Sequence, residues 1–294
     1  MKIHTLLQEK KNFTPHETII ADYLLSHPKN LNQESTRQIA KKLYISPSTI
    51  VRLCQKLGYA GYEEFKQEFL EEYEYQLKNP NTIDPNYPFD HQDPQMTITY
   101  KIGQLYHDIT NDVLSLCHHD RLQKAIQMLL KANHIYLFSA GVQNDIACTF
   151  KDKMLKIGFN IVIETQGDQA YYRASYCDQN DIFIIISYSG ETQITTKITK
   201  KLAQRHIPII AITSYGQNTL SQLASCILYV SSRETLHQNI GNFSMNLSTL
   251  LLLDILYANI FNQHYQTHLE ERSKIAKEFE TVRFSNNPLI KEDS

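Results

Sequence analysis

Several features are scarce in this sequence, and each scarcity excludes a class of protein. Apolar runs such as Leu250–Leu253 are far too short to cross a bilayer, for which about 20 apolar residues are needed. Residues 1–10 contain no apolar core of signal-peptide length. We therefore expect a cytoplasmic protein that has no membrane partner.

Cysteine is also sparse. The five cysteines are odd in number and scattered, at Cys54, Cys117, Cys148, Cys177 and Cys226. No Cys-x-x-Cys pair and no Cys/His cluster has the spacing of a zinc site, so we expect no metal and no other cofactor. Reduced thiols in the cytoplasm are the simplest interpretation.

A strong net charge is absent too. The formal net charge is −2 at pH 7, so any basic surface that binds nucleic acid has to be local. The hydrophobic content of 42% and the charged content of 20% are typical of a soluble globular protein. The 294 residues are enough for two domains, each with a buried core.

The first 77 residues show helical periodicity and no convincing strand. A capping box of Thr14 and Glu17 opens the first clear helix, and Ser35 caps the next one. Gly58 ends the third helix, in the position that favours a left-handed residue. The predicted helices span residues 15–26, 36–43, 47–57 and about 62–75.

The second and third of these helices are joined by a tight turn, which is typical of a helix-turn-helix. Between Ser35 and Tyr62 there are five basic residues and no acidic one. A helix in a DNA groove must avoid carboxylates beside phosphates, so this sorting favours DNA binding over a generic helical bundle or a dimerisation module. The predicted DNA contacts are Arg37, Lys41, Lys42, Ser46, Ser48, Thr49, Arg52, Gln55 and Lys56.

Four prolines then fall within about fifteen residues, from Pro80 to Pro94, and they cannot hold a helix. We predict a linker over residues 78–99. From Tyr100 helical periodicity resumes, and short β-branched runs then alternate with helical stretches, which is typical of a parallel sheet covered by helices on both faces. The five predicted strands are 134–139, 160–164, 181–187, 208–213 and 226–230.

The most informative stretch is Ser187–Thr192, a small hydroxyl-rich loop between a predicted strand and a predicted helix. The first-turn N–H groups of a helix lack partners and carry the positive end of its dipole, so such a loop suits an anion. Serine and threonine hydroxyls add further hydrogen bonds. The residues alone leave two interpretations: a site for a phosphorylated small molecule, or an ordinary turn with Ser189 as N-cap.

Two motifs resemble known families. The loop S-Y-S-G-E-T at Ser187–Thr192, followed by P-I-I-A-I-T at Pro208–Thr213, resembles the SIS (sugar isomerase) domain, in which the loop hydroxyls grip the phosphate of a phosphosugar. The run Ile45–Tyr62, with its S-P-x-T turn, R-x-C-x-K-L-G helix and G-Y-x-G-Y exit, resembles the helix-turn-helix of the RpiR family of bacterial regulators. That family joins the two domains in the order seen here.

The resemblance implies a second pocket segment after the first SIS strand, commonly G-x-G-x-S and here Ser139–Asn144. Gly141 is kept, whereas Gln143 replaces the usual serine, so the ligand is placed differently or is a different sugar. A solvated residue at a helix start is the alternative for Gln143. The implied effector-binding residues are Gly141, Gln143, Asn144, Ser187, Ser189, Gly190, Glu191 and Thr192.

Isomerase chemistry needs a base beside the sugar carbons and often an acid to open the ring. Glu234 and His237 lie in a polar loop that we expect to be solvated, so no acid–base pair is placed for catalysis. We expect no catalytic residues and a transcriptional regulator, a homodimer or homotetramer that binds a double-stranded DNA operator and a phosphorylated sugar. The alternatives are a phosphosugar isomerase or lyase with an added helical domain, and an interaction module whose helical head binds protein.

The expected fold combines an all-α helix-turn-helix domain with a three-layer (αβα) SIS domain built on a five-stranded parallel sheet. The expected boundaries are 1–77 for the DNA-binding domain, 78–99 for the linker, 100–264 for the SIS domain with its leading helix, and 265–294 for a C-terminal helix and tail.

Overall fold

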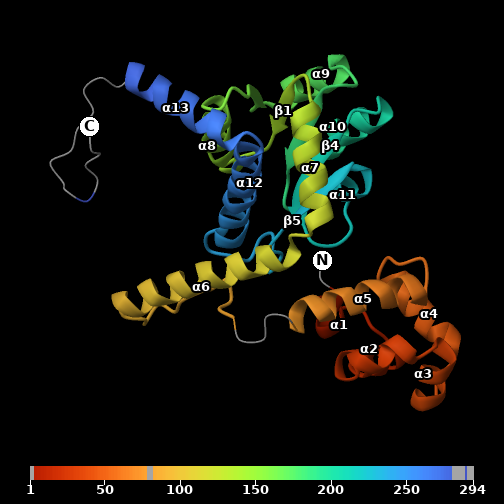
Figure 1. Ribbon diagram of the computed structural model, residues 1–294. Helices are drawn as coiled ribbons and strands as arrows, with labels where there is room; N and C mark the ends of the chain where they lie inside the picture. The colour runs from red at the N-terminus through yellow and green to blue at the C-terminus, as the bar shows by residue number, and fades with distance from the viewer. Residues whose placement is uncertain (1–2, 78–81, 280–288, 290–294) are drawn as a thin grey trace. The chain divides into compact units, whose positions relative to one another are not determined.

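The computed structural model describes residues 3–77, 82–279 and 289. They form two compact units, the first ending at Thr82 and the second beginning at Ile83 (Figure 1). This boundary falls inside the segment predicted as a linker, of which residues 78–81 lie outside the described residues. The predicted tail after Phe279 also lies outside them, apart from Leu289.

The described residues of the first unit form helices joined by turns, and none of them is in a strand. Its elements are α1 Ile3–Glu9, α2 Pro15–Ser26, the 3-10 helix η1 Pro28–Gln33, α3 Thr36–Leu43, α4 Pro47–Lys56 and α5 Tyr62–Leu77. The predicted capping box of Thr14 and Glu17 is confirmed, and Ser35 caps α3 with a box of its own. The prediction omitted α1 and η1, because elements of 7 and 6 residues are too short to show periodicity.

One apolar cluster holds the helices of the first unit together. Leu24 of α2, Ile39 of α3, Leu53 of α4 and Phe65 of α5 are fully buried in it. Burying a Leu, Ile or Phe side chain stabilises a fold by about 1.5–3 kcal/mol. The cluster therefore fixes how α3 and α4 are presented.

The turn between α3 and α4 has an unusual backbone conformation. Tyr44 ends α3 with φ +56°, in the left-handed region. There the N–H groups of Tyr44 and Ile45 both donate to the Ala40 carbonyl oxygen. Glycine adopts this conformation without strain, whereas the Cβ of a tyrosine resists it. Its side chain is 95% exposed, so packing does not offset that strain.

The second unit is a three-layer αβα domain, as predicted (Figure 1). Its elements are α6 Gln95–Leu116, α7 His119–Lys131, β1 Ile135–Phe138, α8 Gln143–Leu155, β2 Ile161–Glu164, α9 Gly167–Tyr176, β3 Ile182–Ile186, α10 Gln193–Gln204, β4 Ile209–Ser214, α11 Thr219–Leu223, β5 Cys226–Val230, α12 Phe243–Gln263 and α13 Tyr265–Phe279. All five predicted strands are confirmed, with ends that move by at most one residue.

The sheet is parallel, in the order β2-β1-β3-β4-β5. Successive side chains of a strand point to opposite faces, and β3 shows the consequence. Ile184 joins a buried cluster with Phe150 of α8 and Leu253 of α12. Phe183 joins the cluster on the other face, with Ile198 of α10. Helices therefore cover both faces, which explains why β3 is apolar at every position.

The structure differs in two respects from the linker predicted over residues 78–99. Helix α6 begins at Gln95, five residues before the predicted Tyr100, with Pro94 as its N-cap residue. The prediction missed this first turn because the β-branched run Thr97–Thr99 has a low helix propensity. In the structure the Ile98 N–H donates to the Pro94 carbonyl oxygen at 3.1 Å, which closes the turn. Residues 83–86 are bonded to the second unit, so this part of the segment belongs to that unit's fold.

Among the described residues, α12 alone is long and apolar enough to cross a membrane. Its Leu252, Leu253 and Leu256 are buried in the cluster that packs on the sheet, as in the core helix of a globular domain. All five cysteines are free thiols, and burial raises the pKa of Cys54 to about 12. No group of potential metal ligands gathers within the described part of the chain.

Candidate functional sites

Helix α4 separates an apolar face from a polar one. Ile50, Leu53 and Cys54 are buried in the first unit. The predicted DNA contacts on the other side are exposed, with Thr49 half-buried; they are Ser46, Ser48, Arg52, Gln55 and Lys56. The Ser46 and Ser48 hydroxyls lie 2.7 Å apart, and Arg52 Nε donates to the Ser48 carbonyl oxygen at 3.4 Å. The polar face predicted from the sequence is therefore present.

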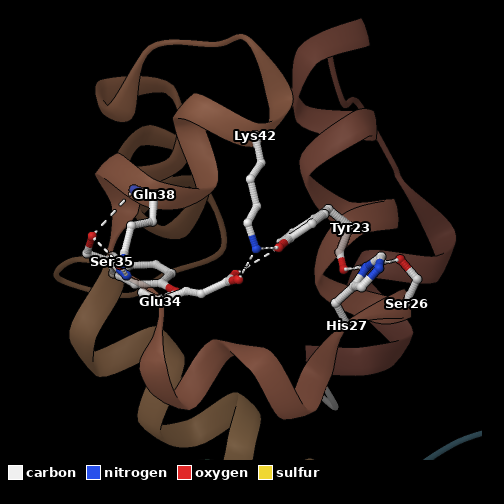
Figure 2. A network of polar contacts seen from close by, with 8 residues as sticks. Tyr23, Ser26, His27, Glu34, Ser35, Gln38 and Lys42 are labelled. Carbon is white, nitrogen blue, oxygen red and sulfur yellow. Dashed lines mark hydrogen bonds and ion pairs between the residues drawn. The ribbon is translucent and has the colours of Figure 1, made fainter.

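Two of the five basic residues predicted to contact DNA form ion pairs with carboxylates that precede Ser35 in the sequence. Lys42 Nζ pairs with Glu34 and also donates to the Tyr23 hydroxyl at 3.2 Å (Figure 2). Lys56 Nζ pairs with Glu17 at 2.8 Å. The remaining three, Arg37, Lys41 and Arg52, are exposed and form no ion pair with a described residue.

The Glu34 carboxylate is mostly buried, whereas its partner Lys42 remains half exposed. Burial alone would raise the pKa of Glu34, but hydrogen bonds from Lys42 and Tyr23 outweigh it and lower that pKa below its ordinary value. In the same way burial acts against ionisation of Glu17, and the Lys56 ammonium and the Thr14 cap lower its pKa. Both carboxylates are therefore ionised partners of α3 and α4 near neutral pH.

The second candidate site lies at the carboxyl edge of the sheet. β1 and β3 are neighbours there, since Phe138 pairs with Ile185. The chain leaves β1 toward one edge of the sheet and leaves β3 toward the other, so this is the switch point where open α/β sheets bind ligands. The segments 139–144 and 187–192, which hold the predicted effector residues, follow these two strands.

The loop Ser187–Thr192 is held by its own hydroxyls. The Gly190 N–H donates to Ser187 Oγ and the Glu191 N–H to Ser189 Oγ, both at 3.2 Å. Helix α10 begins at Gln193, with Thr192 as N-cap residue and no side chain capping its first turn. The alternative in which Ser189 is the N-cap is therefore wrong. Each serine accepts in these bonds and keeps its hydroxyl hydrogen for another partner.

Two residues of this loop, Gly190 and Glu191, contact neighbouring parts of the protein. Gly190 has φ +64°, and a Cβ there would collide with the Asn218 side chain, so only glycine fits. The Glu191 carboxylate accepts from the Thr219 N–H at 2.6 Å and from the Thr219 hydroxyl at 2.8 Å. Glu191 was predicted to bind the effector, and its side chain is bonded to the start of α11.

The helices at this edge differ in how their first turns are satisfied. Asn218 caps α11, together with Glu191. Glu234 caps α12, because its carboxylate accepts from the Ser244 N–H at 2.7 Å and from the Met245 N–H at 3.0 Å. No side chain caps α8 or α10. Both helices that follow the two strands of the switch point thus lack a side-chain cap, so the electrostatics there favour an anion.

The segment after β1 is held by the amide side chains of Gln143 and Asn144. Ser139 Oγ donates to Asn144 Oδ1 at 2.6 Å, which fixes the start of α8, and Gly141 has φ +62°. Gln143 is only 9% exposed, so the alternative of a solvated residue is wrong. Its Nε2 donates to Asn246 Oδ1 at 2.7 Å, and its Oε1 has no hydrogen-bond partner among the described residues.

Glu234 was expected in a solvated loop, and it is 5% exposed. Burial raises its pKa, although the two N–H groups of α12 that it caps act in the opposite direction. The Tyr188 hydroxyl donates to the Glu234 carbonyl oxygen at 2.7 Å. Sequence reasoning missed Tyr188 and Asn246 as parts of the site, since their partners lie 46 and 103 residues away along the chain.

Known proteins share both halves of this arrangement. Residues 1–76 match the helix-turn-helix domain of the rpiR family, and residues 128–259 match the SIS domain. YbbH of Bacillus subtilis (strain 168), an uncharacterized HTH-type transcriptional regulator, is 26% identical over 259 residues that cover 88% of this chain and 89% of that protein. An HTH-type regulator of Haemophilus influenzae is 26% identical over 257 residues, covering 87% and 88%.

Two solved structures share the fold. The NanR protein of Vibrio vulnificus, complexed with ManNAc-6P, has a TM-score of 0.60 and 19% identity over 96% of this chain and 99% of its own. The sugar isomerase domain of an RpiR transcription factor from Sphaerobacter thermophilus has a TM-score of 0.54 and 15% identity, covering 61% of this chain and 98% of its own.

The chain has a helix-turn-helix domain followed by a SIS domain, and it is similar to HTH-type transcriptional regulators along most of their length. These two findings define a DNA-binding transcriptional regulator. The chain belongs to the RpiR family of such regulators. It is therefore a regulator, and not a phosphosugar isomerase or lyase.

The contacts of Glu34 predict how the first unit responds to acid. A carboxyl with a lowered folded-state pKa stabilises the fold above its unfolded-state pKa, about 4.3 for glutamate, and this stabilisation is lost as the pH falls through the folded-state value. We expect Lys42→Met, which removes the ammonium and keeps the alkyl stem, to weaken this acid dependence.

Urea-dependent hydrogen exchange of peptides from residues 15–43, followed from about pH 6 down to about pH 3, measures this effect because the transition spans the ordinary glutamate pKa. Lys41→Met is the matched control, since Lys41 forms no ion pair with a described residue. Equal acid dependence in the Lys42→Met variant and in the wild type would contradict the role of the Glu34–Lys42 pair.

Proposed function

We propose that a phosphorylated sugar binds at the switch point between β1 and β3 and changes the affinity of the helix-turn-helix domain for its operator. The observation that carries this proposal is the uncapped first turn of α10 behind three hydroxyls, those of Ser187, Ser189 and Thr192. Backbone N–H groups at a helix start and neighbouring hydroxyls are the groups that bind a phosphate. NanR, which shares the fold, was solved with ManNAc-6P.

The phosphate and the sugar are recognised by different segments in this proposal. The hydroxyls of the Ser187–Thr192 loop hold the phosphate, and Glu191 and Gly190 keep the loop against α11. Gln143 and Asn246 form an amide pair that faces the rest of the ligand, with the unpartnered Gln143 oxygen as the acceptor for a sugar hydroxyl or amide. Gly141 and Asn144 shape the start of α8 beside them.

On the DNA, we propose that α4 enters the major groove. Arg52 and Gln55 are exposed on its polar face and are the residue types that read base edges bidentately. The hydroxyls of Ser46, Ser48 and Thr49 suit phosphate oxygens, as do the side chains of Arg37 and Lys41. Lys42 and Lys56 can reach phosphates only in competition with Glu34 and Glu17.

We propose a cytoplasmic assembly of at least two chains. A single recognition helix buries too little surface to specify a site in a genome. Exposed apolar side chains are available for self-association on α6 and α13: Met96, Tyr100, Leu114, Leu269, Ile275 and Phe279. A hollow of about 480 Å³, lined by Tyr257, Phe261 and Tyr265, lies where α12 meets α13.

Arg52→Ala should weaken binding to an operator selected from random DNA by about 1–3 kcal/mol and relax the base preference at one position. Lys41→Ala should weaken binding to all sequences alike and lower the slope of log K against log salt by about one. Fluorescence anisotropy with operator and scrambled duplexes at several salt concentrations measures both effects. Unchanged operator affinity in Arg52→Ala would mean that α4 is not the recognition helix.

Ser189→Ala should lower the affinity for the phosphosugar roughly tenfold or more, because a hydrogen bond to a charged group contributes about 1.5–3 kcal/mol. Gln143→Ser should change which sugar is preferred more than it changes phosphate affinity. Calorimetry with ManNAc-6P, a panel of other sugar phosphates and the matched free sugars tests both variants. Ser175→Ala on α9 is the control, since its hydroxyl donates to the Tyr171 carbonyl oxygen within the same helix.

Operator binding without a phosphosugar should survive Ser189→Ala, because the DNA-binding domain is a separate unit. Equal affinity for phosphorylated and free sugars would leave the loop as a structural turn and would overturn the proposed ligand class.

Sedimentation of the full chain should show a dimer or a tetramer, and footprinting should show two half-sites roughly one helical turn of DNA apart. Protection of one isolated half-site by a monomer would refute the proposed assembly.

A further inference from the structure

We infer that the loop between β5 and α12, residues 231–242, relays occupancy of the effector site to the segment 83–87, through which the chain reaches the DNA-binding domain. We call residues 231–242 the relay loop and residues 83–87 the strap. This inference rests on the proposed function for the identity of the effector, but the contacts of the relay stand by themselves.

On the effector side, the relay loop is bonded to the phosphate-binding loop. Tyr188, between Ser187 and Ser189, donates its hydroxyl hydrogen to the Glu234 carbonyl oxygen at 2.7 Å. Burial raises the pKa of Tyr188, so the phenol stays protonated and remains a donor. A displacement of the loop between Ser187 and Ser189 therefore acts on Glu234 directly.

A second contact from the effector site reaches the same region. Gln143 bonds Asn246 in the first turn of α12, and Glu234 caps that turn through Ser244 and Met245. Both effector-site segments thus bond to the junction of the relay loop and α12.

On the other side, the relay loop holds Asn86 of the strap. Asn86 Oδ1 accepts from the Thr235 N–H at 2.8 Å and from the Thr235 hydroxyl at 3.1 Å. Asn86 Nδ2 donates to the Arg233 carbonyl oxygen at 3.3 Å, and the Ile240 N–H donates to the Asn86 carbonyl oxygen at 3.1 Å. Asp84 orients the amide, because its Oδ1 accepts from Asn86 Nδ2 at 2.7 Å.

Arg233 adds a further hold on the strap. Its Nη2 donates to the Ile83 carbonyl oxygen at 2.8 Å, while the Ile83 N–H donates to Asp108 Oδ2 on α6 at 3.1 Å. Arg233 Nη1 is buried and has no partner among the described residues, so its guanidinium is engaged through this contact with the strap. The strap is therefore fixed between α6 and the relay loop.

The coupling passes through one peptide group. The Glu234 carbonyl that accepts from Tyr188 and the Thr235 N–H that donates to Asn86 belong to the same planar trans unit. The C=O and N–H of this peptide unit point in opposite directions, so the effector loop and the strap are hydrogen-bonded to its two sides. A rotation of the peptide unit that changes the Tyr188–Glu234 hydrogen bond also changes the Thr235–Asn86 hydrogen bond. Hydrogen bonds in such a chain also polarise each other.

An effector that binds one position of Tyr188 more tightly therefore selects one state of the strap, which is the segment by which the second unit continues from the first. The coupling is reciprocal: operator binding that prefers one strap state changes effector affinity by the same factor.

The test uses the full chain without any ligand. Tyr188→Phe removes only the hydroxyl, and we expect amide hydrogen exchange in the strap and at Thr235 and Ile240 to accelerate about three- to tenfold, as for the loss of one hydrogen bond. Exchange in α7 should not change. Tyr176→Phe is the matched control, because Tyr176 is exposed. Unchanged exchange in the strap of Tyr188→Phe would overturn the relay.

The second variant acts from the strap side. In Asn86→Ala the ratio of operator affinities with and without saturating ManNAc-6P should fall toward one, while the Kd of ManNAc-6P stays within about twofold, because Asn86 is bonded to the relay loop and not to the effector segments. Asn111→Ala on α6 is the control, since Asn111 is exposed and its amide bonds His107 within the same helix.

A ratio in Asn86→Ala equal to that of the wild type would also overturn the relay. The exchange experiment needs no phosphosugar, so a failure of ManNAc-6P and inorganic phosphate to bind would overturn the proposed effector class and leave the relay to be decided by exchange.

Discussion

Parallel strand pairing is the constraint on which the rest of the second unit depends. Because all five strands run the same way, every strand-to-helix connection that follows them lies at one edge of the sheet. Because the order is β2-β1-β3-β4-β5, the connections after β1 and β3 diverge, and such a switch point is where open α/β sheets bind ligands. The hydroxyls of the Ser187–Thr192 loop, the amides of Gln143 and Asn246 and the start of α12 meet at this edge for topological reasons, whatever ligand they bind.

The helices that begin at this edge differ in whether a carboxylate accepts hydrogen bonds from their first turns. Carboxylates satisfy the first turns of α11 and α12, and both carboxylates come from loops that also touch the candidate effector site. An additional anion would be repelled there. The first turns of α8 and α10 have no side-chain cap, so their N–H groups are not already paired with a carboxylate. The anion site that we propose therefore needs no lysine or arginine in the loop.

Much of the fold could be predicted because its signals are local. Thr14 and Glu17 are three residues apart, and the apolar run 182–186 can be read as a buried strand by itself. The site could be predicted only in part. Gln143 meets Asn246 across 103 residues and Asn86 meets Thr235 across 149, and no periodicity connects positions that far apart. Glu234 looked solvated because its loop is polar, whereas the N–H groups that it caps come from a later helix.

Glu17 and Glu34 have a consequence for how the regulator searches a chromosome. Attraction to random DNA comes mainly from salt ions that free cations displace from phosphates. Lys56 and Lys42 already have carboxylates as counterions, whereas the other three cations between Ser35 and Tyr62 form no ion pair with a described residue and can displace salt. We therefore expect shorter dwell times on unrelated sequence. For a regulator whose net charge is −2, we expect fast release from wrong sites to matter more than tight binding to all DNA.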